Sequence, residues 1–146
     1  MGNKADAVAA WEALFRAQVS VLRTLNAEFP TGELSFNEYD VLFNLSRQPG
    51  RQLRLRDLNR HLLLTQPSVS RLVDRLAARA LVSKTPDPGD GRGTIVGMTD
   101  EGYEIFRRVA VVHADTIQRR VGSALSPAEL RTLATLADKL RLDTER

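Results

Sequence analysis

The sequence predicts a mostly helical α+β fold with six helices and one β-hairpin. Three observations support this prediction. Apolar residues recur at spacings of three and four along most of the chain. Two Ser-x-x-Glu segments, beginning at Ser35 and Ser126, have the pattern of a helix capping box. Two β-branched runs, 81–85 and 94–98, flank a glycine-rich segment and predict a hairpin with a long tip.

Composition narrows the class of protein before any motif is considered. The 146 residues are 42% hydrophobic and 27% charged, which is ordinary for a folded domain. No stretch approaches the roughly 20 apolar residues of a membrane span, and the first residues lack a signal-peptide core, so we expect a cytoplasmic protein that does not contact membranes. No internal repeat or long linker is visible, which favours a single domain over residues 1–146.

Several kinds of chemistry are excluded or disfavoured. The chain has no cysteine, which excludes disulfides, thiolate metal sites and cysteine nucleophiles. The two histidines, His61 and His113, belong to no metal-binding or acid–base motif. We therefore expect no metal, no cofactor, no catalytic residue and no enzyme activity, with His61 at a helix end and His113 in a core.

The first helix is expected over 6–29. Its apolar residues follow a heptad-like seam, which predicts packing along another helix that a second subunit could supply. Pro30-Thr31-Gly32 ends this helix, and the capping box at Ser35 begins the next, which runs to about Arg47. The inward residues expected in this second helix are Tyr39, Leu42, Phe43 and Ser46.

The region most informative about function contains a short helix over 54–61 and a second helix capped by Thr65. The second helix has an apolar stripe of Val69, Leu72, Val73, Leu76 and Ala80. Two short helices joined by a tight turn, with small polar residues and arginines outward on the second, are typical of a helix-turn-helix that enters a DNA major groove. The outward residues are Gln66, Ser68, Ser70, Arg71, Asp74 and Arg75. Alternatively, Arg75 pairs with Asp74 or with another acidic residue and serves only the fold.

The C-terminal third predicts two further helices. Thr99, followed by two acids, begins a helix with Ile105, Phe106, Val109, His113, Ile117 and Val121 inward. The capping box at Ser126 begins the last helix, with Leu130, Leu133, Ala134, Ala137 and Leu140 inward. The glycines of the expected hairpin tip, Pro86–Gly93, match neither a dinucleotide fingerprint nor a P-loop.

Positive charge is concentrated in the middle of the chain. Residues 51–92 contain nine basic and four acidic residues, a net charge of +5, whereas the whole chain carries +3. Eight of the nine basic residues are arginines, whose planar guanidinium pairs bidentately with phosphate or guanine. This asymmetry indicates a polyanionic partner, although a solvated basic face remains the alternative.

Two segments in the same order resemble the MarR family of dimeric winged-helix bacterial transcription regulators. The stretch from Ser68 to Leu76 is similar to the recognition helix of the family, and Asp90-Gly91-Arg92 followed by 96–102 is similar to its wing signature. The resemblance covers nearly the whole chain. Three residues depart from the family pattern, namely Ala80 in place of a common glycine, the inserted Gly91, and Met98 in place of a common leucine.

The resemblance implies a homodimer that binds a pseudo-palindromic duplex DNA operator and represses transcription. It assigns 35–99 to a winged helix-turn-helix lobe and 5–29 with 100–143 to dimerisation helices. Arg92 would reach a minor groove with Asp90 orienting its guanidinium, and Lys84, Arg54 and Arg56 would contact phosphates. The full set of expected DNA-binding residues is Gln66, Ser68, Ser70, Arg71, Arg75, Lys84, Asp90, Arg92, Arg54 and Arg56.

The resemblance also implies a pocket for a small lipophilic or aromatic effector. Candidate lining residues are Trp11, Phe15, Tyr39, Phe43 and His113, although aromatic residues at helical spacing are more often part of a core. A protein-interaction adaptor that uses the same scaffold without specific DNA binding is the alternative function.

Overall fold

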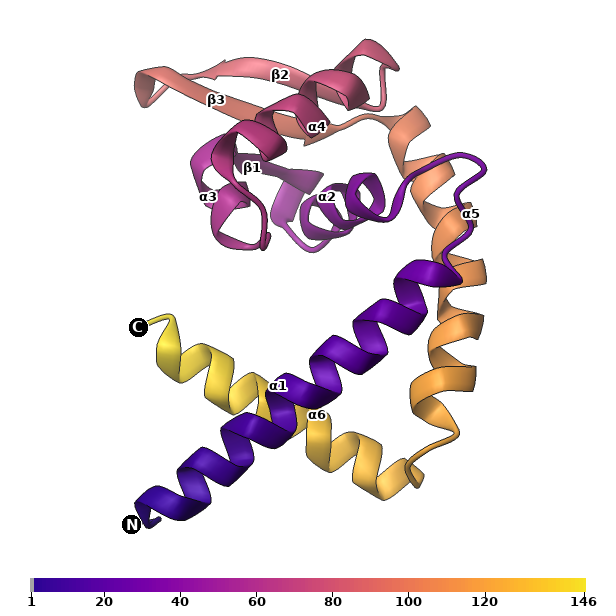
Figure 1. Ribbon diagram of the computed structural model, residues 1–146. Coiled ribbons are helices and arrows are strands. Elements are labelled where there is room, and N and C mark those ends of the chain that lie inside the picture. The colour runs from indigo at the N-terminus through magenta and orange to yellow at the C-terminus, as the bar shows by residue number, and fades with distance from the viewer. Residues whose placement is uncertain (1) are drawn as a thin grey trace. The chain divides into compact units, whose positions relative to one another are not determined.

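The computed structural model describes residues 2–146, and the elements found there confirm the mostly helical fold with a helix-turn-helix, α3–α4, and a hairpin wing, β2–β3 (Figure 1). In chain order the elements are α1 (Lys4–Ala27), α2 (Phe36–Ser46), the 3₁₀ helix η1 (Pro49–Arg51), β1 (Gln52–Arg54), α3 (Leu55–Arg60), α4 (Gln66–Ala78), β2 (Val82–Asp87), β3 (Asp90–Met98), α5 (Asp100–Ile117), the π-helical turn η2 (Gln118–Gly122) and α6 (Pro127–Thr144).

The chain forms two compact units, and α5 passes from one into the other. The winged unit is Pro30–Val112 and contains α2, α3, α4 and the sheet. The terminal unit consists of the residues up to Phe29 together with His113–Arg146, and it contains α1, η2 and α6.

The core of the winged unit is built around α4. Its predicted stripe is confirmed at Val69, Leu72, Val73 and Leu76, which are all buried. These side chains share the interior with Leu58 of α3, Val96 of β3, and Val41, Leu42 and Leu45 of α2. Burial of apolar surface on this scale is the main force that fixes the orientation of α4.

The face of α2 that points inward differs from the prediction. Leu42 is buried as expected, but Phe43 is 40% exposed and Tyr39 and Ser46 are only half-buried. Val41 and Leu45 take the core positions instead. The aromatic residues lie on the flank of the helix, where Tyr39 stacks on Phe106 of α5 with 5.2 Å between ring centroids.

The sheet has three antiparallel strands in the order β1-β3-β2. Strand β1 was not predicted, because three residues are too few to show a period. The expected long tip at Pro86–Gly93 is also wrong. β2 continues to Asp87 and β3 begins at Asp90, so most of that segment lies within the strands and the wing ends in a tight turn.

Side-chain caps define the helix starts as predicted. Both capping boxes are present, so that Ser35 and Ser126 each exchange two hydrogen bonds with the glutamate three residues later. Thr65 caps α4 by accepting a hydrogen bond from the Ser68 amide at 3.3 Å.

The C-terminus of α4 ends in a Schellman turn with an alanine at the left-handed position. The amide of Leu81 donates to the carbonyl of Leu76, and the amide of Ala80 donates to that of Ala77. Ala80 has φ 60° and is exposed, so its expected place in the inward stripe is wrong. The departure from glycine at this position therefore places a Cβ where the backbone disfavours one.

In the terminal unit, the buried residues lie at the chain positions where the unit joins the winged unit, namely just after α1 and in the last part of α5. Phe29, His113 and Thr116 are buried, and the Phe29 and His113 rings meet edge to face with centroids 5.1 Å apart. Glu28 and Arg120 form an ion pair in the same unit.

Phe106, Val109 and His113 of α5 are buried as predicted, whereas Ile117 is 37% exposed. Among residues 2–146, none of α1 or α6 is buried, although both helices carry large apolar side chains.

None of the described helices is long and apolar enough to cross a membrane.

Replacing Ala80 with glycine is expected to stabilise the fold by about 1 kcal/mol, because glycine adopts a positive φ without the steric penalty of a Cβ. Urea unfolding at matched protein concentration measures the change. The control is Ala78→Gly, because Ala78 is the last residue of α4. This substitution is expected to lower the free energy of unfolding by roughly 0.5–1 kcal/mol. If Ala80→Gly destabilises as much as Ala78→Gly, the assignment of backbone strain to Ala80 is wrong.

Candidate nucleic-acid interface

A polar groove lies between the N-terminal end of the helix-turn-helix and the wing. It has a volume of about 320 Å³, and its lining comes from β1, α3, the first turns of α4, and the hairpin. The lining residues are Arg54, Leu55, Arg56, Asn59, Gln66, Ser70, Asp87, Asp90, Arg92, Gly93 and Thr94. Three guanidinium groups therefore share one hollow with small hydrogen-bonding side chains, a composition suited to a phosphate-bearing partner.

The outer face of α4 presents two arginines to solvent. Arg71 and Arg75 are exposed one helical turn apart, opposite the buried stripe. The Arg71 guanidinium donates to the Ser68 hydroxyl at 3.3 Å, while Thr65 donates to the same oxygen at 2.9 Å. Ser68 therefore supports Arg71, whereas Gln66 and Ser70 face the groove.

Asp74 pairs with Lys84 and not with Arg75. The Lys84 ammonium on β2 lies 2.6 Å from an Asp74 carboxylate oxygen, which ties the wing to α4. The alternative in which Arg75 serves the fold through Asp74 is therefore not what the structure shows. Within residues 2–146, Arg75 makes no ion pair, whereas Lys84 is already engaged.

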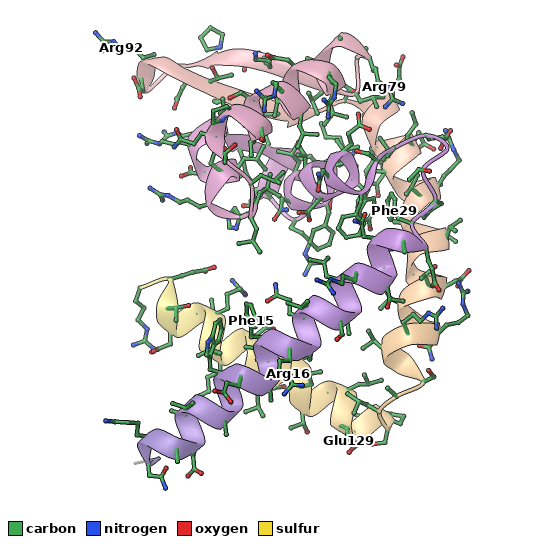
Figure 2. The ribbon with its side chains drawn as sticks, in the orientation of Figure 1. Phe15, Arg16, Phe29, Arg79, Arg92 and Glu129 are labelled. Atoms are coloured by element: carbon green, nitrogen blue, oxygen red, sulfur yellow. The ribbon has the colours of Figure 1, made fainter. Side chains whose placement is uncertain are left out.

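Arg92 lies at the end of the wing. It is exposed, and Figure 2 shows its side chain projecting beyond the hairpin. The Asp90 carboxylate accepts a hydrogen bond from the backbone amide of Arg92 at 3.1 Å. Asp90 therefore shapes the backbone at the turn and makes no ion pair with the Arg92 guanidinium among the described residues.

Arg54 is held by a residue that the sequence reasoning missed. Its Nε atom lies 2.7 Å from Oδ2 of Asp87, a carboxylate that is only 4% exposed. The other Asp87 oxygen accepts from the amide of Gly89 at 2.9 Å. The Asp-x-Gly spacing at the hairpin is the local signal that could have identified Asp87 as a turn residue.

Two more groove residues complete the surface. Arg56 on α3 is exposed and makes no ion pair within the described chain. Asn59, also missed, has a buried Oδ1 atom without a hydrogen-bond partner in the described residues. Asn59 therefore contributes a polar side chain to the groove lining, although its Oδ1 atom is not exposed there.

The remaining arginines of this charged segment support the fold. Arg60 lies 3.5 Å from Asp57, and Arg79 bonds to Glu38 and to the carbonyl of Glu33. The Arg51 guanidinium stacks on the Tyr103 ring at 3.6 Å from its centroid. These contacts separate structural arginines from Arg56, Arg71, Arg75 and Arg92, whose charges are not neutralised by an ion pair.

The five candidate effector residues fall into three aromatic contacts. Trp11 and Phe15 pair on α1 with centroids 5.7 Å apart, Tyr39 and Phe43 stack on α2 at 6.5 Å, and His113 meets Phe29. Trp11, Phe15 and His113 belong to the terminal unit, whereas Tyr39 and Phe43 belong to the winged unit. Burial lowers the pKa of His113 and raises the pKa of Tyr39.

His61 is the C-terminal cap residue of α3 and is exposed. No cluster of three or more metal-ligating side chains occurs in the part of the chain that the structure describes.

Comparison with known proteins places this geometry in a family. A sequence model of the MarR family matches residues 33–93, which include the helix-turn-helix and the start of β3. The HTH-type transcriptional regulator PecS of Dickeya dadantii is 26% identical over 128 residues, which cover 87% of this chain and 76% of PecS.

Solved structures extend the similarity to the full length. Sco3205 of Streptomyces coelicolor, a MarR family transcriptional regulator solved in complex with DNA, has a TM-score of 0.74 and 26% identity, covering 97% of this chain and 89% of its own. BpsR of Bordetella bronchiseptica, whose DNA binding is regulated by 6-hydroxynicotinic acid, has a TM-score of 0.73 and 26% identity, covering 91% and 98%.

The family match covers α4 and every groove residue except Thr94, and the structural similarity includes the long terminal helices. These relatives are transcriptional regulators, a class without enzymatic activity. The chain is similar to the MarR family of transcriptional regulators over residues 33–93 in sequence, and to a solved MarR family regulator over nearly its whole length in structure.

Proposed function

We propose that this regulator binds duplex DNA sequence-specifically through the outer face of α4, the wing and the groove between them. The observation that carries the proposal is the set of arginines on these elements that are exposed and have no acidic partner among residues 2–146, namely Arg56, Arg71, Arg75 and Arg92. Such uncompensated charge suits a polyanionic duplex.

Each element has a distinct part in the proposed complex. The N-terminal half of α4, with Gln66, Ser70 and Arg71, enters the major groove, where arginine and glutamine can read base edges. Arg92 enters the adjacent minor groove. Arg54 and Arg56 contact phosphates and set the position of the domain without reading sequence. Lys84 has a secondary part, because a phosphate must compete with Asp74 for its ammonium.

The active form in this proposal is a homodimer made by the segments 5–29 and 100–143, with 35–99 as the DNA-binding lobe. Trp11 and Phe15 on α1 are 58% and 51% exposed, and α6 exposes a comparable apolar row. Large apolar side chains grouped on helix faces in this way are rarely left in water by a stable protein. The α6 row is Leu133, Leu136 and Leu140, which share one helix face, while Leu142 is exposed on the opposite face. Two-fold symmetry then requires half-sites about 10 base pairs apart.

Repression in the cytoplasm and release by a small aromatic or lipophilic effector complete the proposal. The effector part is supported by BpsR, whose DNA binding responds to 6-hydroxynicotinic acid. Trp11, Phe15, Tyr39, Phe43 and His113 remain the proposed effector contacts.

Sedimentation equilibrium is expected to give twice the 16.2 kDa chain mass. Trp11→Glu is expected to shift the protein towards monomer by placing a charge in the apolar interface. Ser20→Glu is the matched control, since Ser20 is exposed and lies about half a helical turn away in direction from Trp11. A monomeric wild-type protein at micromolar concentration would contradict the dimer proposal.

Selection from a random duplex library with purified protein is expected to recover a two-fold symmetric site. On that site, Arg71→Ala is expected to weaken binding by about 1–3 kcal/mol and to relax preference at one position in each half-site. Arg56→Ala is expected to weaken binding to all sequences and to lower the salt slope by about 1 per protomer. Fluorescence anisotropy at several salt concentrations measures both effects.

Arg107→Ala is the control for loss of one positive charge, because Arg107 is exposed on α5 and belongs neither to the groove nor to α4 or the wing. If Arg107→Ala reduces affinity as much as Arg71→Ala, binding depends on net charge alone and the proposed interface is wrong.

A further inference from the structure

The DNA-facing groove contains a carboxylate, and simple electrostatics would disfavour it there. Asp87 lines the groove beside Arg54, Arg56 and Arg92, and its negative charge repels phosphate. It is also the single buried acidic side chain among residues 2–146. Burying a carboxylate costs free energy unless it is paired and hydrogen-bonded, so its neighbours must account for it.

The two oxygens of Asp87 connect two different segments. Oδ2 lies 2.7 Å from Nε of Arg54, at the junction of β1 and α3, while Oδ1 accepts from the Gly89 amide in the wing turn at 2.9 Å. A single carboxylate therefore couples the conformation of the wing turn to the position of the Arg54 guanidinium. Charge-assisted bonds of this length are the stronger class of hydrogen bond.

The backbone around Asp87 is shaped to admit this arrangement. A Cβ on Gly93 would lie 3.1 Å from Cβ of Asp87 and 3.3 Å from the Asp90 carbonyl oxygen, closer than ordinary van der Waals contact. The absence of a side chain at Gly93 leaves room for Asp87 between the strands, where the β2–β3 pairing is irregular between Pro86 and Asp87.

Arg54 keeps part of its binding capacity in this pairing. Asp87 engages Nε, and the Arg54 side chain remains 44% exposed at the groove. Its terminal nitrogens make no other hydrogen bond with the described residues, and Nη2 lies beside Gly89, 3.6 Å from where a Cβ on that residue would be. These nitrogens have donors left for an incoming oxyanion.

We propose that Asp87 is a positioning residue for DNA binding, which fixes the wing turn and directs the terminal nitrogens of Arg54 towards a phosphate of the duplex. This inference rests on the proposed DNA-binding function. It makes a prediction opposite to that of net charge, because removal of the acid should weaken binding although it makes the groove more positive.

The test compares Asp87→Asn with Asp115→Asn on the selected duplex by fluorescence anisotropy at several salt concentrations. Asparagine can still accept from the Gly89 amide but loses the ion pair with Arg54. Asp115→Asn is the matched control, since it removes the same charge from an exposed carboxylate on α5, outside the groove, α4 and the wing. We expect Asp87→Asn to weaken binding about tenfold with a smaller salt slope, and Asp115→Asn to bind as tightly as wild type.

The Arg54→Ala background separates positioning from general support of the wing. If Asp87 acts through Arg54, adding Asp87→Asn to Arg54→Ala changes affinity less than about twofold. An undiminished tenfold loss there overturns the role assigned to Arg54. Affinity of Asp87→Asn equal to or above wild type overturns the proposal while the DNA-binding function stands, whereas absence of wild-type binding to any duplex removes both.

Arg54→Lys provides a second test if Asp87→Asn unfolds, as judged by circular dichroism. Lysine retains the charge but lacks the Nε donor with two further nitrogens beyond it. Binding by Arg54→Lys as tight as wild type contradicts the proposal, and a loss of about tenfold supports it.

Discussion

Burial of one face of α4 is the constraint on which the rest of the structure depends. Val69, Leu72, Val73 and Leu76 form a stripe that is removed from water against α2, α3 and β3. With that stripe fixed inward, helical geometry places Arg71 and Arg75 outward. Thr65 at one end and the Schellman turn at Ala80 at the other set where the helix starts and stops. The chemistry of the surface is thus a consequence of the packing beneath it.

The positive surface arises from selective pairing as much as from composition. Acidic residues of the winged unit neutralise particular cations, so that Asp74 pairs with Lys84, Glu38 with Arg79 and Glu33 with Arg108. These pairs connect elements within the unit and leave Arg56, Arg71, Arg75 and Arg92 without acidic partners in the described part of the chain. Because salt-bridged cations attract a polyanion less, the distribution of acids defines the binding surface as clearly as that of the arginines.

Local sequence predicts what depends on local geometry. Both capping boxes, the Thr65 cap and the α4 stripe apart from Ala80 follow from spacing within a few residues, and these are confirmed. The predicted inward face of α2 is wrong, because aromatic side chains were expected in the core. The smaller Val41 and Leu45 fill the core instead, and Tyr39 packs on Phe106. Strand β1 exists only through its pairing with β3, more than 40 residues away, which no periodicity in three residues reveals.

The same distinction applies to the candidate interface. Helical spacing was enough to place Arg71 and Arg75 on one outward face, but the contact of Asp87 with Arg54 joins residues far apart in sequence. Likewise, Asp74 satisfies Lys84 on the wing and not its neighbour Arg75. Ion pairs of this kind depend on tertiary structure, so a sequence can identify the charged residues without indicating which of them are free to bind.

The central claim is that Arg56, Arg71, Arg75 and Arg92, which make no ion pair within residues 2–146, dock on the duplex, whereas Arg108 and Arg120, whose ion pairs lie outside the proposed interface, do not. Arginine Nε–H resonances, followed by NMR during titration with the selected duplex, test this directly. The account predicts perturbation at Arg56, Arg71, Arg75 and Arg92 and unchanged signals at Arg108 and Arg120, which pair with Glu33 and Glu28. Perturbation confined to Arg108, Arg120 and other residues outside the winged surface would contradict it.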